Sequence, residues 1–223
     1  MTTGPTVGGR RPDTTALATE LGRLALAVGT AASFNRLFTG WDFLGRLLPT
    51  VVIGWALAAA LRRLRAPVGV GLAVHLVVGA VLLTVQFAPG THLLGLPTPD
   101  TAHALGRAIE SSFAEFSELV APVPPRDGFL VVIAAGLWIF AAFLDIAAER
   151  FRGTVQAAVP HTAVFVTVGV LARSSGRTLA VALFGTGLLL YAVTQVGSAA
   201  AAQRWVDGHE RRGVRAFAGR SAV

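Results

Sequence analysis

Apolar residues are gathered into six long runs along the chain, and polar residues are concentrated between the runs. A helix rises about 1.5 Å per residue, so about 20 apolar residues cross the ~30 Å hydrocarbon core of a bilayer. The runs therefore predict an all-α integral membrane protein. We expect a six-helix bundle in which three helices precede and three follow a polar loop (3+3). The predicted spans cover residues 17–38, 47–61, 67–88, 128–148, 153–172 and 178–202.

The polar segments define the remaining organisation of the chain. Residues 1–16 begin with Gly, Thr and Pro and predict a disordered cytoplasmic tail. Transmembrane helices 1–3 are expected within residues 17–88, and helices 4–6 within residues 128–202. An extracytoplasmic loop over residues 89–127 joins the two groups, and residues 203–223 form a basic cytoplasmic tail.

Two of the predicted spans are weaker than the others. The first has an uninterrupted apolar core only from Leu24 to Phe34, so Arg23 and Arg36 are expected to extend to opposite interfaces. A helix lying on the membrane surface is the alternative for this segment. The second span, 47–61, is about 22 Å long as a helix, which is shorter than the hydrocarbon core. The third carries Gly69, Gly71 and Gly79, which predict close helix approach.

The loop is expected to contain one amphipathic helix, at about residues 101–120. Apolar residues recur there at steps of three and four, with acidic residues off the apolar face. The apolar positions are Leu105, Ile109, Phe113, Phe116 and Val120. Asp100 or Thr101 is a suitable cap for the start of the helix. We expect the helix to lie on the outer surface of the bundle.

Composition and charge support this class of protein. Only 14% of the residues are charged, against about 25% in soluble domains. The net charge of +7 comes from 19 basic residues, all of them Arg. These arginines flank the spans, so they indicate membrane orientation and not nucleic-acid binding. Most lie inside if both termini are cytoplasmic, and the main orientation arginines are Arg62, Arg63, Arg65, Arg150 and Arg152.

Four polar side chains fall inside the predicted spans and are candidates for intramembrane chemistry: His75, His161, Asp145 and Gln195. Ionisable groups in such positions are often functional, as metal ligands or in proton relays. The alternative for the histidines is a neutral ring hydrogen-bonded to another helix, which we favour because neither has a second ligand one turn away. Asp145 with Glu149 and Arg150 predicts a proton-coupling site or, preferably, a structural ion pair.

Other functional classes are poorly supported by the sequence. There is no cysteine, which excludes a disulfide framework or a thiolate nucleophile in this chain. Phosphate-binding loops, dinucleotide fingerprints and zinc-protease motifs are absent. His92 and His103 flank Asp100, but zinc needs more converging donors. We therefore expect no catalytic, cofactor-binding or metal residues, and the lipid bilayer as the main partner.

Two blocks of the sequence carry a family resemblance. They read QFAPGTHLLGLPTPDTAHALGRAIESSFAEFSELVAPVPPRDGFL and WIFAAFLDIAAERFRGTVQAAVP. Together with the order of spans, they resemble the N-terminal membrane domain of TgpA-type transglutaminase-like bacterial membrane proteins. In that family the domain precedes an extracytoplasmic transglutaminase-like domain with a Cys-His-Asp triad, followed by another span. The resemblance implies location in the bacterial cell membrane.

The resemblance carries no catalytic residue into this chain, because the chain has no cysteine to serve as the nucleophile of the triad. It implies a non-catalytic membrane domain, either truncated or stand-alone, that anchors or positions an envelope enzyme or its partners. The alternatives are a small transporter or channel and a scaffold that presents the acidic loop. Convergence of His75, His161 and Asp145 on a continuous cavity would favour transport, and a solid interior would favour the anchor.

Overall fold

The computed structural model describes residues 14–114, 120–151, 153–172 and 176–220, with side chains described only as far as residue 198. Within this part the chain forms seven α-helices and no strand. The helices are α1 (Thr14–Ser33), α2 (Asp42–Arg63), α3 (Val68–Phe87), α4 (Pro99–Ala114), α5 (Asp127–Asp145), α6 (Thr154–Leu171) and α7 (Arg177–Arg220). A short 3₁₀ turn, Phe34–Arg36, follows α1, and a π turn, Ile146–Arg150, follows α5. The predicted all-α class is confirmed.

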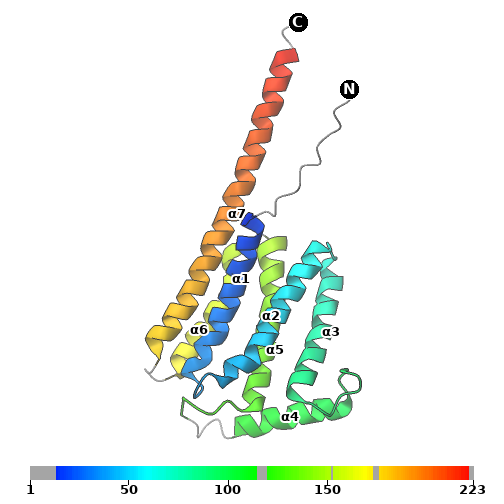
Figure 1. Ribbon diagram of the computed structural model, residues 1–223, viewed down its shortest axis with the longest axis vertical. Helices are drawn as coiled ribbons and strands as arrows, with labels where there is room; N and C mark the ends of the chain where they lie inside the picture. The colour runs from blue at the N-terminus through cyan, green and yellow to red at the C-terminus, as the bar shows by residue number, and fades with distance from the viewer. Residues whose placement is uncertain (1–13, 115–119, 152, 173–175, 221–223) are drawn as a thin grey trace, which may run out of the picture.

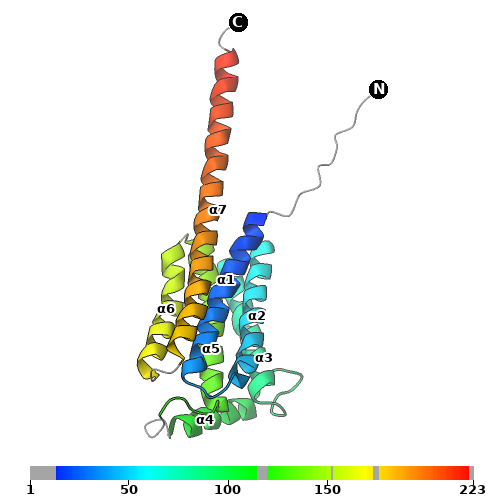
Figure 2. The ribbon, with the colours of Figure 1, turned by 60° about the vertical axis from the view of Figure 1, so that its left-hand side comes forward.

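Six of the helices lie alongside one another, and α4 lies across one end of them (Figure 1). At the opposite end α7 continues beyond the bundle as a single helix, and both views show this projection (Figure 2). Five helical segments are long and apolar enough to cross a membrane: Asp42–Arg63, Val68–Phe87, Asp127–Ala148, Thr154–Leu171 and Arg177–Ser198. The first predicted span, residues 17–38, corresponds to α1, which is not one of these five because Glu20 and Arg23 reduce its hydropathy.

The two halves of the chain are interleaved and do not form separate groups of three. The most extensive helix contacts join α1 to α7 and α2 to α5. The main apolar core also draws on both halves, including Phe43, Leu47 and Val51 from α2 with Leu130 and Ala134 from α5. Sequence order does not reveal this pairing, because any helix of a bundle can pack beside any other.

Several predicted boundaries differ from those observed. Helix α1 begins at Thr14, inside the tail predicted for residues 1–16, and residues 1–13 lie outside the described part. Helix α2 has 22 residues and not 15, which gives about 33 Å at 1.5 Å per residue, enough to cross the hydrocarbon core. Two arginines near the ends of α2 have acidic partners: Arg46 pairs with Asp127 at 3.0 Å, and Arg62 pairs with Glu20.

Helix α4 starts earlier than expected and has a different cap. The hydroxyl of Thr98 accepts a hydrogen bond from the backbone N–H of Thr101 at 3.3 Å, and the Thr101 hydroxyl accepts one from the N–H of Thr98 at 3.1 Å. This reciprocal arrangement is a capping box, with Pro99 in the first helical position that it prefers. The expectation that Asp100 or Thr101 is the cap was therefore wrong. At the other end Val120 is not helical, and residues 115–119 lie outside the described part.

The apolar side of α4 packs onto the end of the bundle. Leu105 and Ile109 contact the main core, and the rings of Phe113 and Phe129 meet edge to face with centroids 5.1 Å apart. The backbone of α4 comes so close to Gly128, at the start of α5, that a Cβ there would overlap the carbonyl of Ala108. Helix α4 is therefore fixed across the ends of the other helices.

Glycines allow α1 and α7 to lie in close contact. A Cβ at Gly187 of α7 would lie 2.5 Å from the carbonyl oxygen of Ala25, and one at Gly29 of α1 would lie 2.9 Å from the carbonyl oxygen of Leu183. Between α3 and α5, Gly79 leaves the room that the Trp138 indole occupies, whereas a Cβ at Gly69 would meet nothing within 4 Å. Close approach was predicted for α3, but the tightest pairing of the bundle involves α1.

This packing predicts different effects of an alanine substitution at two glycines of α7, Gly187 and Gly185. Gly187→Ala should destabilise the protein by about 1–3 kcal/mol, because the methyl group must displace the backbone of α1. Gly185→Ala should be neutral or stabilising by up to about 1 kcal/mol, because a Cβ there meets open space and alanine favours a helix. Thermal unfolding of the detergent-purified variants measures both, and equal effects would contradict the close contact.

Candidate functional site

Four charged side chains from three helices meet inside the bundle. The Oε1 atom of Glu20 accepts hydrogen bonds from Arg23, at 3.3 Å, and from Arg62 of α2. Arg62 also pairs with Asp145 of α5. The four side chains expose 13%, 2%, 23% and 12% of their surface for Glu20, Arg23, Arg62 and Asp145. Two carboxylates and two guanidinium groups therefore neutralise one another in a largely buried position.

Helix α7 completes this arrangement. Nε and Nη2 of Arg23 lie 3.1 and 3.2 Å from the terminal amide of Gln195 and donate to its oxygen in the orientation that satisfies both groups. The indole N–H of Trp55 donates to the backbone carbonyl of Glu20 at 3.1 Å. We call Glu20, Arg23, Arg62, Asp145 and Gln195 the charge cluster. It connects α1, α2, α5 and α7.

The structure changes the interpretation of three residues: Arg23, Arg36 and Asp145. Arg23 does not extend to an interface, because Glu20 one turn earlier and Gln195 on α7 supply acceptors within the bundle. Arg36, for which the same behaviour was expected, is also buried, with 7% of its surface exposed. Asp145 pairs with Arg62 of another helix. Glu20 was not among the predicted candidates, although its spacing of three residues from Arg23 is typical of an ion pair on one helix.

Helix α2 and the π turn after α5, which carry Arg62, Arg63 and Arg150, end at the side of the bundle opposite α4 (Figure 1). Arg63 and Arg65 are exposed where α2 ends, whereas Arg62 turns inward to the charge cluster. Arg150 ends the π turn after α5, and Arg152 lies outside the described residues. Among the described residues, the end opposite α4 thus exposes Arg63 and Arg65, and the end that carries α4 exposes Arg107 and Arg177.

His75 forms a reciprocal pair with Trp138 between α3 and α5. Its Nε2 donates to the carbonyl oxygen of Trp138 at 3.0 Å, and the indole N–H of Trp138 donates to the carbonyl oxygen of His75 at 2.9 Å. The two ring centroids are 4.5 Å apart. The carbonyl can only accept, so Nε2 carries the proton. These contacts join α3 to α5 and use the Nε2–H of His75 in a hydrogen bond between helices.

His161 forms a separate connection between α6 and α1. Its Nδ1 lies 2.9 Å from the hydroxyl of Thr30, and that hydroxyl donates to the carbonyl of Leu26 at 2.8 Å. The hydroxyl has one proton, so it accepts from Nδ1–H of the ring. The His161 ring also meets Phe140 edge to face, with centroids 5.5 Å apart. His161 therefore belongs to a different set of contacts from His75 and Asp145.

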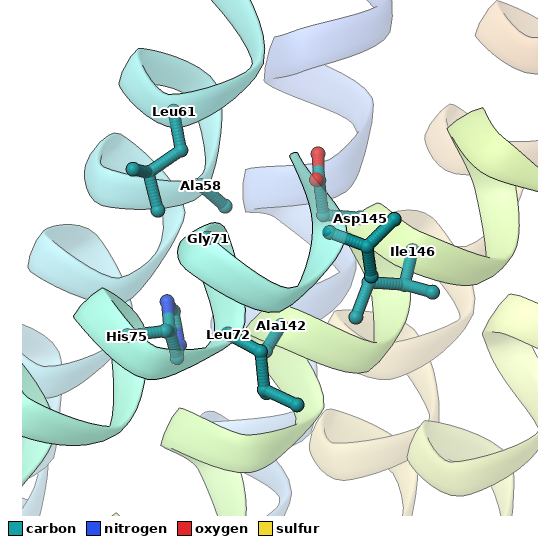
Figure 3. Close-up of a pocket in the computed structure, with 9 residues that line it drawn as sticks. Ala58, Leu61, Gly71, Leu72, His75, Ala142, Asp145 and Ile146 are labelled. Atoms are coloured by element: carbon teal, nitrogen blue, oxygen red, sulfur yellow. The ribbon is translucent and has the colours of Figure 1, made fainter. Parts of the chain in front are cut away.

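Only two of the three ionisable candidates line a common cavity. His75 and Asp145 lie on opposite sides of a cavity between α2, α3 and α5 whose volume is about 20 Å³ (Figure 3). A second cavity of about 20 Å³ adjoins the charge cluster at Glu20, Arg23, Arg62 and Asp145. Each has about the room that one water molecule needs. Among the described residues, no group of three or more metal-ligating side chains comes together.

Long apolar helices, with paired charges between them, are typical of an integral membrane protein. The chain matches the family model described as the TgpA N-terminal domain over residues 25–223. It therefore belongs to the TgpA N-terminal domain family, and the family's catalytic domain is not in this chain. No curated protein and no solved structure matches the chain.

The charge cluster predicts unequal costs for removing two carboxylates. Glu20→Gln should destabilise the protein by about 3 kcal/mol, because it leaves two buried guanidinium groups with one anion between them. Asp127→Asn removes a pair whose side chains are 57% and 41% exposed, for Asp127 and Arg46, and should cost less than about 1 kcal/mol. Thermal unfolding in detergent compares the two, and similar losses would contradict a desolvated cluster.

Proposed function

We propose that this chain is a six-span, non-catalytic membrane domain that anchors or positions a protein-modifying enzyme of the bacterial cell envelope. The family match over residues 25–223 is the observation that carries this proposal. The interior supports it: the two cavities that Asp145 lines, one of them shared with His75, each have room for about one water, which favours a structural bundle over a transport path.

Helix α1 is the sixth crossing in this proposal. Leu26, Thr30 and Ala31 are completely buried, and the helix packs between α2 and α7. Hydropathy treats Glu20 and Arg23 as charges exposed to lipid, but both are paired inside the bundle. Charged groups in a membrane segment are tolerated when they face the interior and pair in this way.

Lipid is the solvent that suits the outer surface of the bundle. Large apolar side chains are exposed on three helices, at Leu76 and Val77 of α3, Val159 and Val170 of α6, and Leu189 and Val193 of α7. Exposed apolar surface of this extent is unusual in a soluble monomer. In a bilayer it faces hydrocarbon.

The loop between α3 and α4 supports the same placement. Leu93, Leu94 and Leu96 are 70%, 95% and 56% exposed. The loop folds back along α3, since a Cβ at Gly95 would lie 3.8 Å from Val81 and 3.9 Å from Val85. The leucines therefore lie beside a surface of α3 that faces lipid, where they can enter the interface.

The arginines give the proposed orientation. Arg63 and Arg65 are exposed at the end opposite α4, whereas α4 exposes two acidic residues, Asp100 and Glu110, and one arginine, Arg107. Basic residues next to spans are enriched on the cytoplasmic side. Both chain termini are then cytoplasmic, and α4 is the face offered to an extracytoplasmic enzyme.

The absence of cysteine allows the topology to be tested directly. Single variants Thr14→Cys, Thr39→Cys, Arg65→Cys and His103→Cys introduce thiols at exposed positions. A membrane-impermeant maleimide applied to intact cells should label positions 39 and 103 and leave 14 and 65 unlabelled until the cells are opened. Equal labelling at 14 and 39 would mean that α1 does not cross the membrane.

The positioning role predicts a partner at α4. A photocrosslinking amino acid placed at exposed Arg107 or Glu110 should capture an extracytoplasmic protein with a transglutaminase-like domain in the native host. The same group at exposed Leu64, which is at the opposite end, is the matched control. Capture from position 64 alone, or of cytoplasmic proteins only, would contradict the proposal.

A further inference from the structure

A cavity of about 420 Å³ lies between α6 and α7 near the end of the bundle that α4 covers. Among the described residues, the two charged ones that line it are Arg36, in the turn after α1, and Arg177, at the start of α7. Its other walls include Phe165, Val166 and Val181. The cavity is about twenty times larger than those beside the charge cluster, and its charges have one sign.

The guanidinium group of Arg36 is built into the wall of this cavity. The residue is 7% exposed, and Nη1 donates to the carbonyl oxygen of Gly169 at 3.5 Å. A Cβ at Gly169 would lie 3.4 Å from the same nitrogen, so glycine allows the cation to lie directly against α6. Arg177 is exposed. One arginine is therefore buried against α6, and the other is exposed at the start of α7.

We propose that this cavity binds the phosphate of an anionic phospholipid headgroup. Guanidinium groups recognise phosphate through paired, charge-assisted hydrogen bonds, and these are stronger where water is excluded. Helix α7 also begins at Arg177, so its positive N-terminal end lies at the edge of the same cavity. The inference rests on the proposed placement of the bundle in a bilayer and adds a ligand class to it.

The walls of the cavity favour a lipid over free phosphate. Val166 and Val181 line the cavity and are also 55% and 49% exposed on the outside of α6 and α7. An apolar path therefore leads from the arginines onto the lipid-facing surface. The headgroup would lie between Arg36 and Arg177, and an acyl chain would follow the two valines. Free phosphate would use the arginines and leave the apolar walls without a ligand.

The test uses the full chain, purified in neutral detergent, with dioleoyl phosphatidylglycerol as the probe and binding followed by native mass spectrometry. Dioleoyl phosphatidylcholine is the neutral control lipid. Arg36→Gln and Arg177→Gln should each weaken phosphatidylglycerol binding by about tenfold, the loss of one charge-assisted contact. Arg65→Gln removes the same charge at the opposite end and should leave binding unchanged. Arg177 is exposed, so its variant tests the site even where Arg36→Gln fails to fold.

Three results would overturn the proposal. Phosphatidylglycerol binding that is unchanged in Arg177→Gln excludes the site. If Arg65→Gln weakens binding as much as Arg177→Gln does, the lipid is held only by general attraction between charges. Complete displacement by millimolar inorganic phosphate assigns the arginines to the free anion. Because the measurement uses neither cells nor an enzyme partner, its failure is distinct from failure of the topology or crosslinking tests.

Discussion

Neutralisation of charge inside the bundle decides how the helices of this protein can pack. A single ionised group is costly in a dry interior, and it persists there only with a partner of opposite charge. Glu20, Arg23, Arg62 and Asp145 satisfy that condition as two pairs of opposite sign. Because the members come from α1, α2 and α5, the pairing also selects which helices lie together. Breaking it would leave α1 with charges that lipid cannot solvate.

Close packing of small residues acts together with this electrostatic selection. Glycines bring the backbones of α1 and α7 close together, and Gly79 of α3 leaves room for the indole of Trp138 from α5. Lipid does not drive helices together as water does, so van der Waals contact and interhelical hydrogen bonds must contribute more. The pairs His75–Trp138 and Thr30–His161 are two such hydrogen-bonded contacts. A bundle held in this way is suited to a structural role.

Much of the fold was predictable because lipid imposes a simple rule on sequence. Five predicted spans correspond to helices that are long and apolar enough to cross a membrane. The first span was harder to assess, because hydropathy adds residues one at a time and cannot record that Glu20 and Arg23 have partners. Among the candidate site residues, His75, His161, Asp145 and Gln195 were identifiable as polar positions within apolar runs. Their partners were not, since these come from other helices.

The amino-acid sequence predicts the helical class and the approximate limits of the helices, because both depend on local composition. It also predicts the family, because the family is recognised by the order of motifs along the chain. Only the packed structure shows that α1 pairs with α7, that Arg23 turns inward, and that Arg36 and Arg177 line one cavity. These features join residues that are far apart in the chain. They depend on the direction of each helix face, which packing and charge pairing select together.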